Sequence, residues 1–317
     1  MVSKHLYKQY LYKHYYIHHT SSHQTVFCIS PSFYYWVHIA NIKLYLLSLV
    51  EKMTSNHNEE RQKIAIVTGG TGGIGFATSK ALASQGYNLI LGYLSDSENA
   101  KKCLQELETD FNIEVRTISG DVCEEGTVNS YFSCLNEMNG KLTAIVHTAG
   151  LFKPNSFSKD PNTCFSTFEY YDYYQDIYPK CFIRLVETGM KFMEDGHGYI
   201  VCLSSPGCNI NDHVRLGYMM PGTGKCVLEY LSRHYAKMLA KRGISCNCIV
   251  PGYIQTKPWK LRESILGPDV GCQRTPMGRW GQPEEIGDFI SYLCSPKASF
   301  LTGATIPFDG GLSLGKQ

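Results

Sequence analysis

A glycine-rich turn between an apolar run and a helical pattern is the feature that most constrains this chain. Residues Gly69–Gly75 read GGTGGIG and directly follow the apolar run Lys63–Thr68. The segment after the turn has the apolar spacing of a helix. Strand, turn and helix in this order point backbone N–H groups and the positive end of the helix dipole at one spot. Because glycines let a phosphate approach the backbone closely, the turn predicts a pyrophosphate site of the kind that binds a dinucleotide.

Strand-like and helix-like stretches alternate along the rest of the chain. The expected strands are short apolar runs at 63–68, 88–93, 114–118, 143–148, 199–203, 245–250 and 305–307. The expected helices have apolar residues at helical spacing and cover 74–85, 97–108, 124–138, 173–194, 224–241 and 283–293. Continuous apolar runs suit parallel strands that are covered on both faces. The pattern predicts an α/β fold, with a doubly wound, seven-stranded parallel sheet in a single domain.

Residues 1–59 differ in composition from the rest and are expected to lie outside the fold, which then spans 60–317. Three interpretations stay open: a disordered or non-native extension with Met53 as the true start, a mitochondrial targeting segment, and a membrane anchor. Residues 1–52 contain almost no acidic residues, which suits a targeting segment. Polar residues interrupt the apolar stretch 31–50, so no membrane contact by this segment is expected.

Composition restricts the partners and the compartment. The net charge of the 317 residues is only +2, so the overall charge gives no reason to expect nucleic-acid binding. Thirteen cysteines are scattered without a C-x-x-C pair. This usage predicts reduced thiols in the cytoplasm and no metal site.

Short motifs follow the predicted strands, where a doubly wound sheet binds its ligand. They are Thr68–Gly75, Asp121-Val122, His147–Gly150, Ser204-Ser205, Pro251–Thr256 and Phe308–Gly311. This set resembles the short-chain dehydrogenase/reductase family over nearly everything after Lys63. The resemblance implies a Rossmann-like fold, a nicotinamide cofactor and hydride transfer.

The resemblance also implies the cofactor contacts. They are Gly69, Thr71, Gly72, Gly73, Ile74, Gly75, Tyr93, Ser95, Asp121, Val122, Thr148, Ala149, Gly150, Lys225, Pro251, Gly252, Ile254 and Thr256. Asp121 looks like the family's adenine contact, with a strand-ending turn as the alternative. Thr256 looks like the hydroxyl near the nicotinamide carboxamide, with a helix cap as the alternative. His147 stands where the family often has asparagine and is expected to be a packed or ribose-side residue rather than a base.

The end of the second predicted strand bears on the choice of cofactor. NAD users carry an acid there to bind the ribose hydroxyls, whereas this chain has Tyr93, followed by Leu94 and Ser95. No carboxylate repels a 2′-phosphate, which favours NADP(H) over NAD(H). Gly72 departs from this pattern, because NADP users of the family often carry arginine at that position.

The catalytic stretch departs from the family pattern. Most members place tyrosine and lysine four residues apart on one helix, but here Pro221 stands four residues before Lys225. Tyr218 lies seven residues before Lys225, about two helical turns, and 13 after Ser205, which is the family's usual serine-to-tyrosine gap. This Tyr-x6-Lys spacing resembles the enoyl-thioester reductases of the family. The resemblance therefore implies Ser205, Tyr218 and Lys225 as the catalytic set.

A second departure concerns proton supply. Tyr178 occupies the place of an asparagine that supports a proton-relay water in the family. The leading hypothesis is an NADP(H)-dependent reductase of C=O or conjugated C=C bonds in a small, largely apolar substrate, of 3-oxoacyl or enoyl type. The alternative is a nucleotide-binding protein of this fold with little or no redox turnover. Residues 257–275 are the expected lid over the substrate, and the family resemblance implies a homodimer or homotetramer.

Overall fold

The structure, a computed structural model, describes residues 16–19, 25–28, 62–150, 168–209, 213–214, 218–257 and 270–314. The chain divides into two compact units, Met1–Glu60 and Arg61–Gln317. In the first unit, strands β1 (Tyr16–His19) and β2 (Thr25–Cys28) pair antiparallel. The expected role of the N-terminal segment stays a prediction. No helix among the described residues is both long enough and apolar enough to cross a bilayer.

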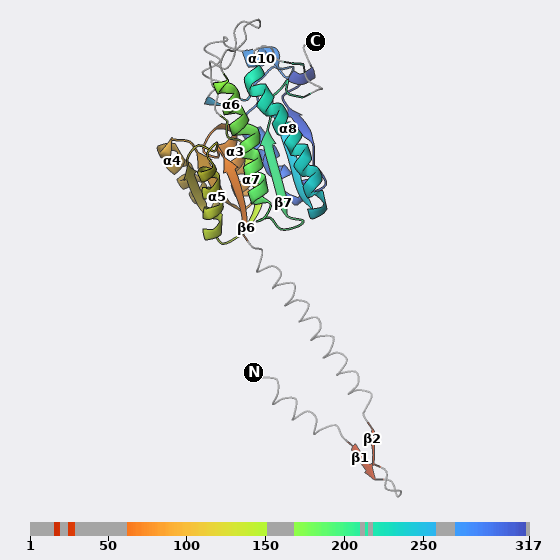
Figure 1. Cartoon of the computed structure of the whole chain (residues 1–317). Coiled ribbons are helices and arrows are strands. Elements are labelled where there is room, and N and C mark those ends of the chain that lie inside the picture. Colours follow the sequence, from red (N-terminus) through yellow and green to blue (C-terminus); the bar gives the residue numbers. More distant parts are fainter. Residues whose placement is uncertain are drawn as a thin grey trace. The chain divides into compact units, whose positions relative to one another are not determined.

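A seven-stranded parallel sheet forms the centre of the second unit (Figure 1). In spatial order its strands are β5 (Val115–Ser119), β4 (Tyr87–Tyr93), β3 (Lys63–Thr68), β6 (Lys141–His147), β7 (Gly198–Leu203), β8 (Ile244–Pro251) and β9 (Thr305–Phe308). The strand order reverses between β3 and β6, which places the ligand crevice beyond their carboxyl ends. The predicted Rossmann-like fold with seven parallel strands is confirmed.

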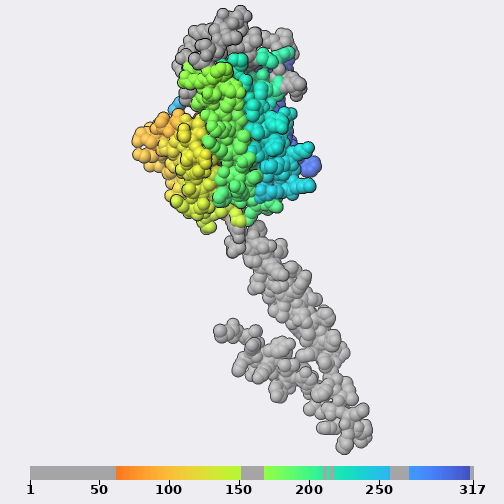
Figure 2. Space-filling model, viewed as in Figure 1, coloured from red at the N-terminus to blue at the C-terminus, as the bar shows by residue number. Residues whose placement is uncertain are grey.

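Helices cover both faces of this sheet. One face carries α5 (Glu125–Glu137), α6 (Glu169–Gln175), the π-helix η2 (Asp176–Lys180), α7 (Cys181–Gly189) and α8 (Met219–Leu239). The other carries α3 (Gly73–Ser84), α4 (Ser97–Phe111) and α11 (Pro283–Leu293). The short helix α10 (Val270–Arg274) precedes α11, and 3-10 turns lie at Ala240–Arg242, Pro296–Ala298 and Leu312–Leu314. Figure 2 shows the first face, on which α5 to α8 adjoin one another.

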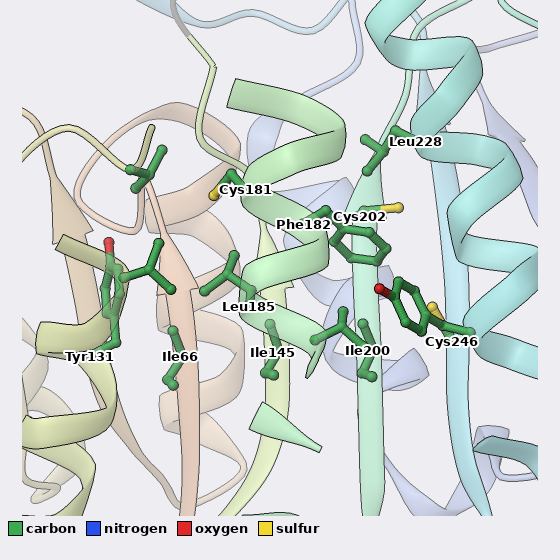
Figure 3. Close-up of a cluster of buried hydrophobic side chains, with 14 of the residues drawn as sticks. Ile66, Tyr131, Ile145, Cys181, Phe182, Leu185, Ile200, Cys202, Leu228 and Cys246 are labelled. Atoms are coloured by element: carbon green, nitrogen blue, oxygen red, sulfur yellow. The ribbon is translucent and has the colours of Figure 1, made fainter. Parts of the chain in front are cut away.

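The alternating side chains of the strands build the two core layers. On β3, Ile64 and Ile66 belong to the layer under α5 to α8, whereas Ala65 and Val67 belong to the layer under α3, α4 and α11. All four are fully buried, as a parallel strand covered on both faces requires. Figure 3 shows Phe182 and other side chains of α7 packing on strands β3, β6 and β7.

Two helices differ most from the predicted ranges, while the other predicted helices agree to within three residues at each end. The single helix expected at 173–194 is α6, η2 and α7 in succession, because Pro179 has no N–H to donate and the chain widens into a π-turn around it. Helix α8 begins at Met219 rather than Gly224. Its first turn includes Pro221, whose missing N–H costs nothing there because the first four N–H groups of a helix have no partner within it.

Candidate active site

The glycine turn after β3 fits the start of α3 against strand β6. Gly69 and Gly73 have φ of +67° and +50°, a region that L side chains rarely adopt. A Cβ at Gly75 would lie 2.1 Å from the carbonyl oxygen of Gly69, so only glycine fits there. At Gly72, by contrast, an added Cβ would meet nothing within 4 Å. The turn therefore has one closed position and one open position only three residues apart.

The residues present at this turn suit a dinucleotide. Helix α3 begins after Gly72 with no side-chain cap and no acid in its first turn. Since the helix's own first turn offers these N–H groups no acidic partner, they suit the negatively charged oxygens of a pyrophosphate. Thr256 lies close by, its Cγ2 being 3.3 Å from a Cβ built on Gly73. Its placement beside the turn agrees with a cofactor contact.

A chain of hydrogen bonds ties the end of β6 to β3 and to η2. The Ala149 N–H donates to Thr68 Oγ1 (3.2 Å), and the Thr68 hydroxyl lies 2.8 Å from His147 Nδ1. His147 Nε2 lies 2.9 Å from the Ile177 carbonyl, which can only accept, so we assign the proton to Nε2. Burial, and then the charge of Lys225, lowers the pKa of His147 to about 3. His147 is a neutral packed residue, as predicted.

The residues that the family resemblance assigns to the adenosine lie at the ends of β4 and β5. Tyr93 ends β4 and is half-buried, while Ser95 is exposed. The Asp121 carboxylate accepts from the backbone N–H of Cys123 (2.9 Å), so it closes the turn after β5, and Val122 beside it is buried. The turn role and the adenine role of Asp121 are compatible, because a carboxylate has two oxygens.

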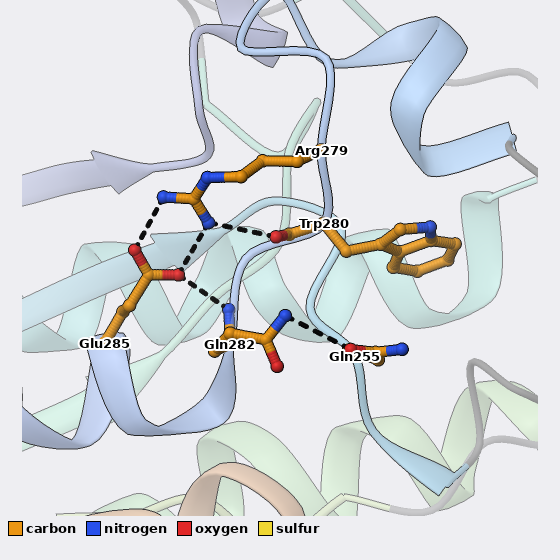
Figure 4. Close-up of polar contacts among 5 residues, drawn as sticks. All are labelled: Gln255, Arg279, Trp280, Gln282 and Glu285. Atoms are coloured by element: carbon orange, nitrogen blue, oxygen red, sulfur yellow. Dashed lines mark hydrogen bonds and ion pairs between the residues drawn. The ribbon is translucent and has the colours of Figure 1, made fainter.

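The segment after β8 is fixed from the start of α11. The Gly252 N–H donates to the Phe308 carbonyl (3.0 Å), and Ile254 bridges to Gly281. Gln282 Nε2 donates to Gln255 Oε1 at 3.1 Å, next to Thr256 (Figure 4). Gln282, which makes this contact, is itself held in place. Glu285 accepts two hydrogen bonds from Arg279 and one from the Gln282 backbone, at 2.7 to 2.8 Å. These bonds hold the Pro251–Thr256 segment over the crevice.

The predicted serine and tyrosine meet at the end of β7. Tyr218 lies at the N-cap of α8, and its hydroxyl donates to Ser205 Oγ at 2.9 Å. Pro221, at the place where the family usually has its tyrosine, is buried. The structure thus brings together the pair that the 13-residue gap indicated.

Lys225 reaches the same strand end from about two turns further along α8 than Tyr218. Its Nζ donates to the Leu203 carbonyl at 2.6 Å, two residues before Ser205. The residue is only 8% exposed, and burial lowers the pKa of its ammonium group to about 8. The hydroxyls of Tyr218 and Ser205 and the ammonium group of Lys225 are therefore held within three residues, 203–205, at the end of β7.

Two buried side chains near this site were not predicted as functional neighbours. Glu229, 4% exposed, accepts a hydrogen bond from the Ser204 hydroxyl. The sequence pattern that could have identified Glu229 is an acid four residues after Lys225, on the buried face of the same helix. In the sequence Tyr178 stands out only because it replaces the family's asparagine. Its ring lies under the Lys225 ammonium group, with Nζ 3.5 Å from the ring centroid.

Residues 69–313 match the family model adh_short_C2, described as enoyl-(acyl carrier protein) reductase. A short-chain dehydrogenase/reductase from Serratia marcescens is 26% identical, with a TM-score of 0.71 over 80% of this chain and 98% of that one. The chain belongs to the short-chain dehydrogenase/reductase family. As a member, it is an NAD(P)-dependent oxidoreductase.

Other relatives in this family are named as reductases or hold NADPH. The 3-oxoacyl-[acyl-carrier-protein] reductase FabG of Aquifex aeolicus is 26% identical over 79% of this chain and 97% of its own length. A blue fluorescent protein from a metagenomic library, solved with NADPH, is 26% identical, with a TM-score of 0.70 over 80% of this chain and 98% of that one. The match covers both the nucleotide half and the catalytic half described above.

Proposed function

We propose that this oxidoreductase uses NADP(H) and reduces a C=O or conjugated C=C bond in a small, largely apolar substrate of the 3-oxoacyl or enoyl type. The observation that carries the proposal is the 2.9 Å hydrogen bond between the Tyr218 and Ser205 hydroxyls at the Tyr-x6-Lys spacing. Two hydroxyls directed at one place can bind an oxygen that gains negative charge during the reaction.

When bound, the reduced nicotinamide supplies the hydride. Ser205 orients the substrate oxygen by a hydrogen bond, and Tyr218 gives it a proton or stabilises its charge. The Lys225 ammonium, held at the Leu203 carbonyl, lowers the pKa of the Tyr218 phenol by its positive charge. For a ketone the oxygen becomes an alkoxide, and for a conjugated thioester it becomes an enolate, so the same groups serve both.

Preference for NADP(H) is supported by the absence of an acid at Tyr93, Leu94 and Ser95, where a carboxylate would repel a 2′-phosphate. It is also supported by the NADPH bound to the metagenomic relative. The scattered cysteines support a cytoplasmic protein. Exposed apolar residues on the outer side of α8, Val227 and Tyr230 among them, support a homodimer or homotetramer.

The test is an assay of the purified full chain. Consumption of NADPH and NADH is followed with 3-oxoacyl thioesters, enoyl thioesters, ketones and aldehydes. The proposal predicts turnover with at least one of the thioester classes, with a higher kcat/KM for NADPH than for NADH. Tight NADPH binding with no turnover on the whole panel would contradict it and support the nucleotide-binding alternative.

A further inference from the structure

An aromatic ring lies directly against the ammonium group of Lys225. Lys225 Nζ is 3.5 Å from the centroid of the Tyr178 ring, well within the range of a cation–π contact. Both residues are buried, at 8% exposure each. In a desolvated place such a contact is worth more than on a surface, because water does not compete for the cation.

The backbone around Tyr178 fixes the ring in this position. Tyr178 lies in the π-helix η2, and the carbonyl of the residue before it, Ile177, is held by His147. Its ring stacks on Tyr174, with centroids 5.7 Å apart and planes at 14°. Gly224 lets α8 come close, since a Cβ there would lie 2.6 Å from the Tyr174 carbonyl oxygen and 3.2 Å from the Tyr178 ring.

The far end of the same ring reaches the crevice. Tyr178 Oη lies 3.2 Å from a Cβ built on Gly150, one of the predicted cofactor contacts after β6. The tyrosine thus spans the distance from Lys225 to the end of β6. It fills this path with an aromatic side chain, at the position where the sequence lacks the family's relay asparagine.

Other titratable groups also surround Lys225. They come from β6, β7, β8, the loop after β7 and α8 itself, and are His147, Cys202, Cys248, Cys208 and Glu229. The hydrogen bond to Cys202, and then burial, keeps the pKa of Cys248 well above its usual value, so this thiol is neutral near pH 7, as is His147. Glu229 is engaged by Ser204. The π face of Tyr178 therefore adds a second source of negative potential to that of Glu229.

We propose that Tyr178 is a positioning residue whose ring face holds Lys225 in its charged form and thereby sets the upper pH limit of the reaction. The proposal rests on the role of Lys225 in the proposed function. It concerns the ring rather than the hydroxyl, since the contact is made through the π face.

The experiment compares Tyr178→Phe with Tyr178→Leu, using the pH dependence of kcat/KM for NADPH-linked reduction. Phenylalanine keeps a π face, so the alkaline limb of its profile is expected to stay where the wild type has it. Leucine removes the face and favours the neutral amine, so its alkaline limb is expected to move down by about one pH unit. Tyr178→Met, whose unbranched side chain is longer and adapts better to an irregular space, repeats the test if leucine leaves the protein poorly folded.

A second readout separates this proposal from the proposed function. NADPH affinity measured by fluorescence across the same pH range also depends on the charge of Lys225, even if no substrate is turned over. A leucine-specific downward shift in that titration supports Tyr178 in its role, whether or not the wild type is a reductase. Profiles that coincide for wild type, Tyr178→Leu and Tyr178→Met would overturn the proposal, as would a shift that is equally large in Tyr178→Phe.

Discussion

The glycine turn after β3 and the start of α8 are two halves of the proposed site, and they follow from the sequence in different ways. In the turn the site is formed by backbone. Gly69 and Gly73 are explained by their positive φ and Gly75 by the Gly69 carbonyl, whereas Gly72 is open to other residues. At the start of α8 the site is formed by side chains. Their positions depend on the N-cap of α8, on Pro221 and on the π-helix η2. A site formed by backbone can thus be predicted from local sequence, whereas a site formed by side chains also depends on how distant elements pack together.

Replacing the Tyr218 hydroxyl tests the side-chain half and has the largest expected effect. Tyr218→Phe keeps the ring at the α8 N-cap but leaves Ser205 without its donor. Loss of a proton donor should lower kcat by roughly 10² to 10⁴-fold. The matched control is Tyr230→Phe, an exposed tyrosine on the same helix that should keep wild-type rates. Equal rates in all three proteins would remove Tyr218 from the mechanism.

A methyl group at Gly75 tests the backbone half. Gly75→Ala would bring a Cβ to 2.1 Å from the Gly69 carbonyl oxygen, so the turn must shift. We expect the NADPH affinity to fall by roughly 10 to 100-fold and the free energy of unfolding to fall by about 1 to 3 kcal/mol. Gly72→Ala is the control, because its Cβ meets nothing within 4 Å. Fluorescence titration and chemical denaturation check both, and equal losses at the two positions would show that the turn is not closed as described.

The pH profile joins the two halves, because Lys225 serves both the nucleotide and the phenol. Burial lowers the pKa of this lysine to about 8, so the ammonium form is complete below that pH and is lost as the pH rises through it. The kcat/KM for reduction should therefore fall about tenfold for each pH unit above roughly 8. A profile that stays flat to pH 10 would mean that the charge of Lys225 is not required.

A charge added at the open position of the turn should have a smaller effect. Gly72 has φ −155° and ψ 155°, a conformation open to any residue, and space around it. Gly72→Arg should raise the preference for NADPH over NADH by about threefold to tenfold, because the guanidinium can pair with a 2′-phosphate. The ratio of kcat/KM values for the two cofactors measures it, with Gly72→Ala as the uncharged reference. A drop in this ratio would contradict the expected location of the 2′-phosphate.

Much of the fold was predictable because its cause is local. Strand β3 and helix α11 have the predicted bounds, since the first is a continuous apolar run and the second begins with a proline and two acids. The start of α8 was predicted too late, because Pro221 and Gly222 are poor helix formers and the first turn depends on tertiary contacts. The contact between Tyr178 and Lys225 could not be predicted from the sequence, because the π-turn changes which side of the helix this ring faces.

The most direct test of the central claim is a crystal structure of the full chain with NADP⁺ bound, which shows where the Tyr218 hydroxyl points. The account predicts that this hydroxyl stays within hydrogen-bond distance of Ser205 Oγ and faces the nicotinamide ring, with Lys225 on the ribose. A Tyr218 ring turned to solvent, with no other acidic group beside the hydride-bearing carbon, would contradict the assignment of this tyrosine as the proton donor.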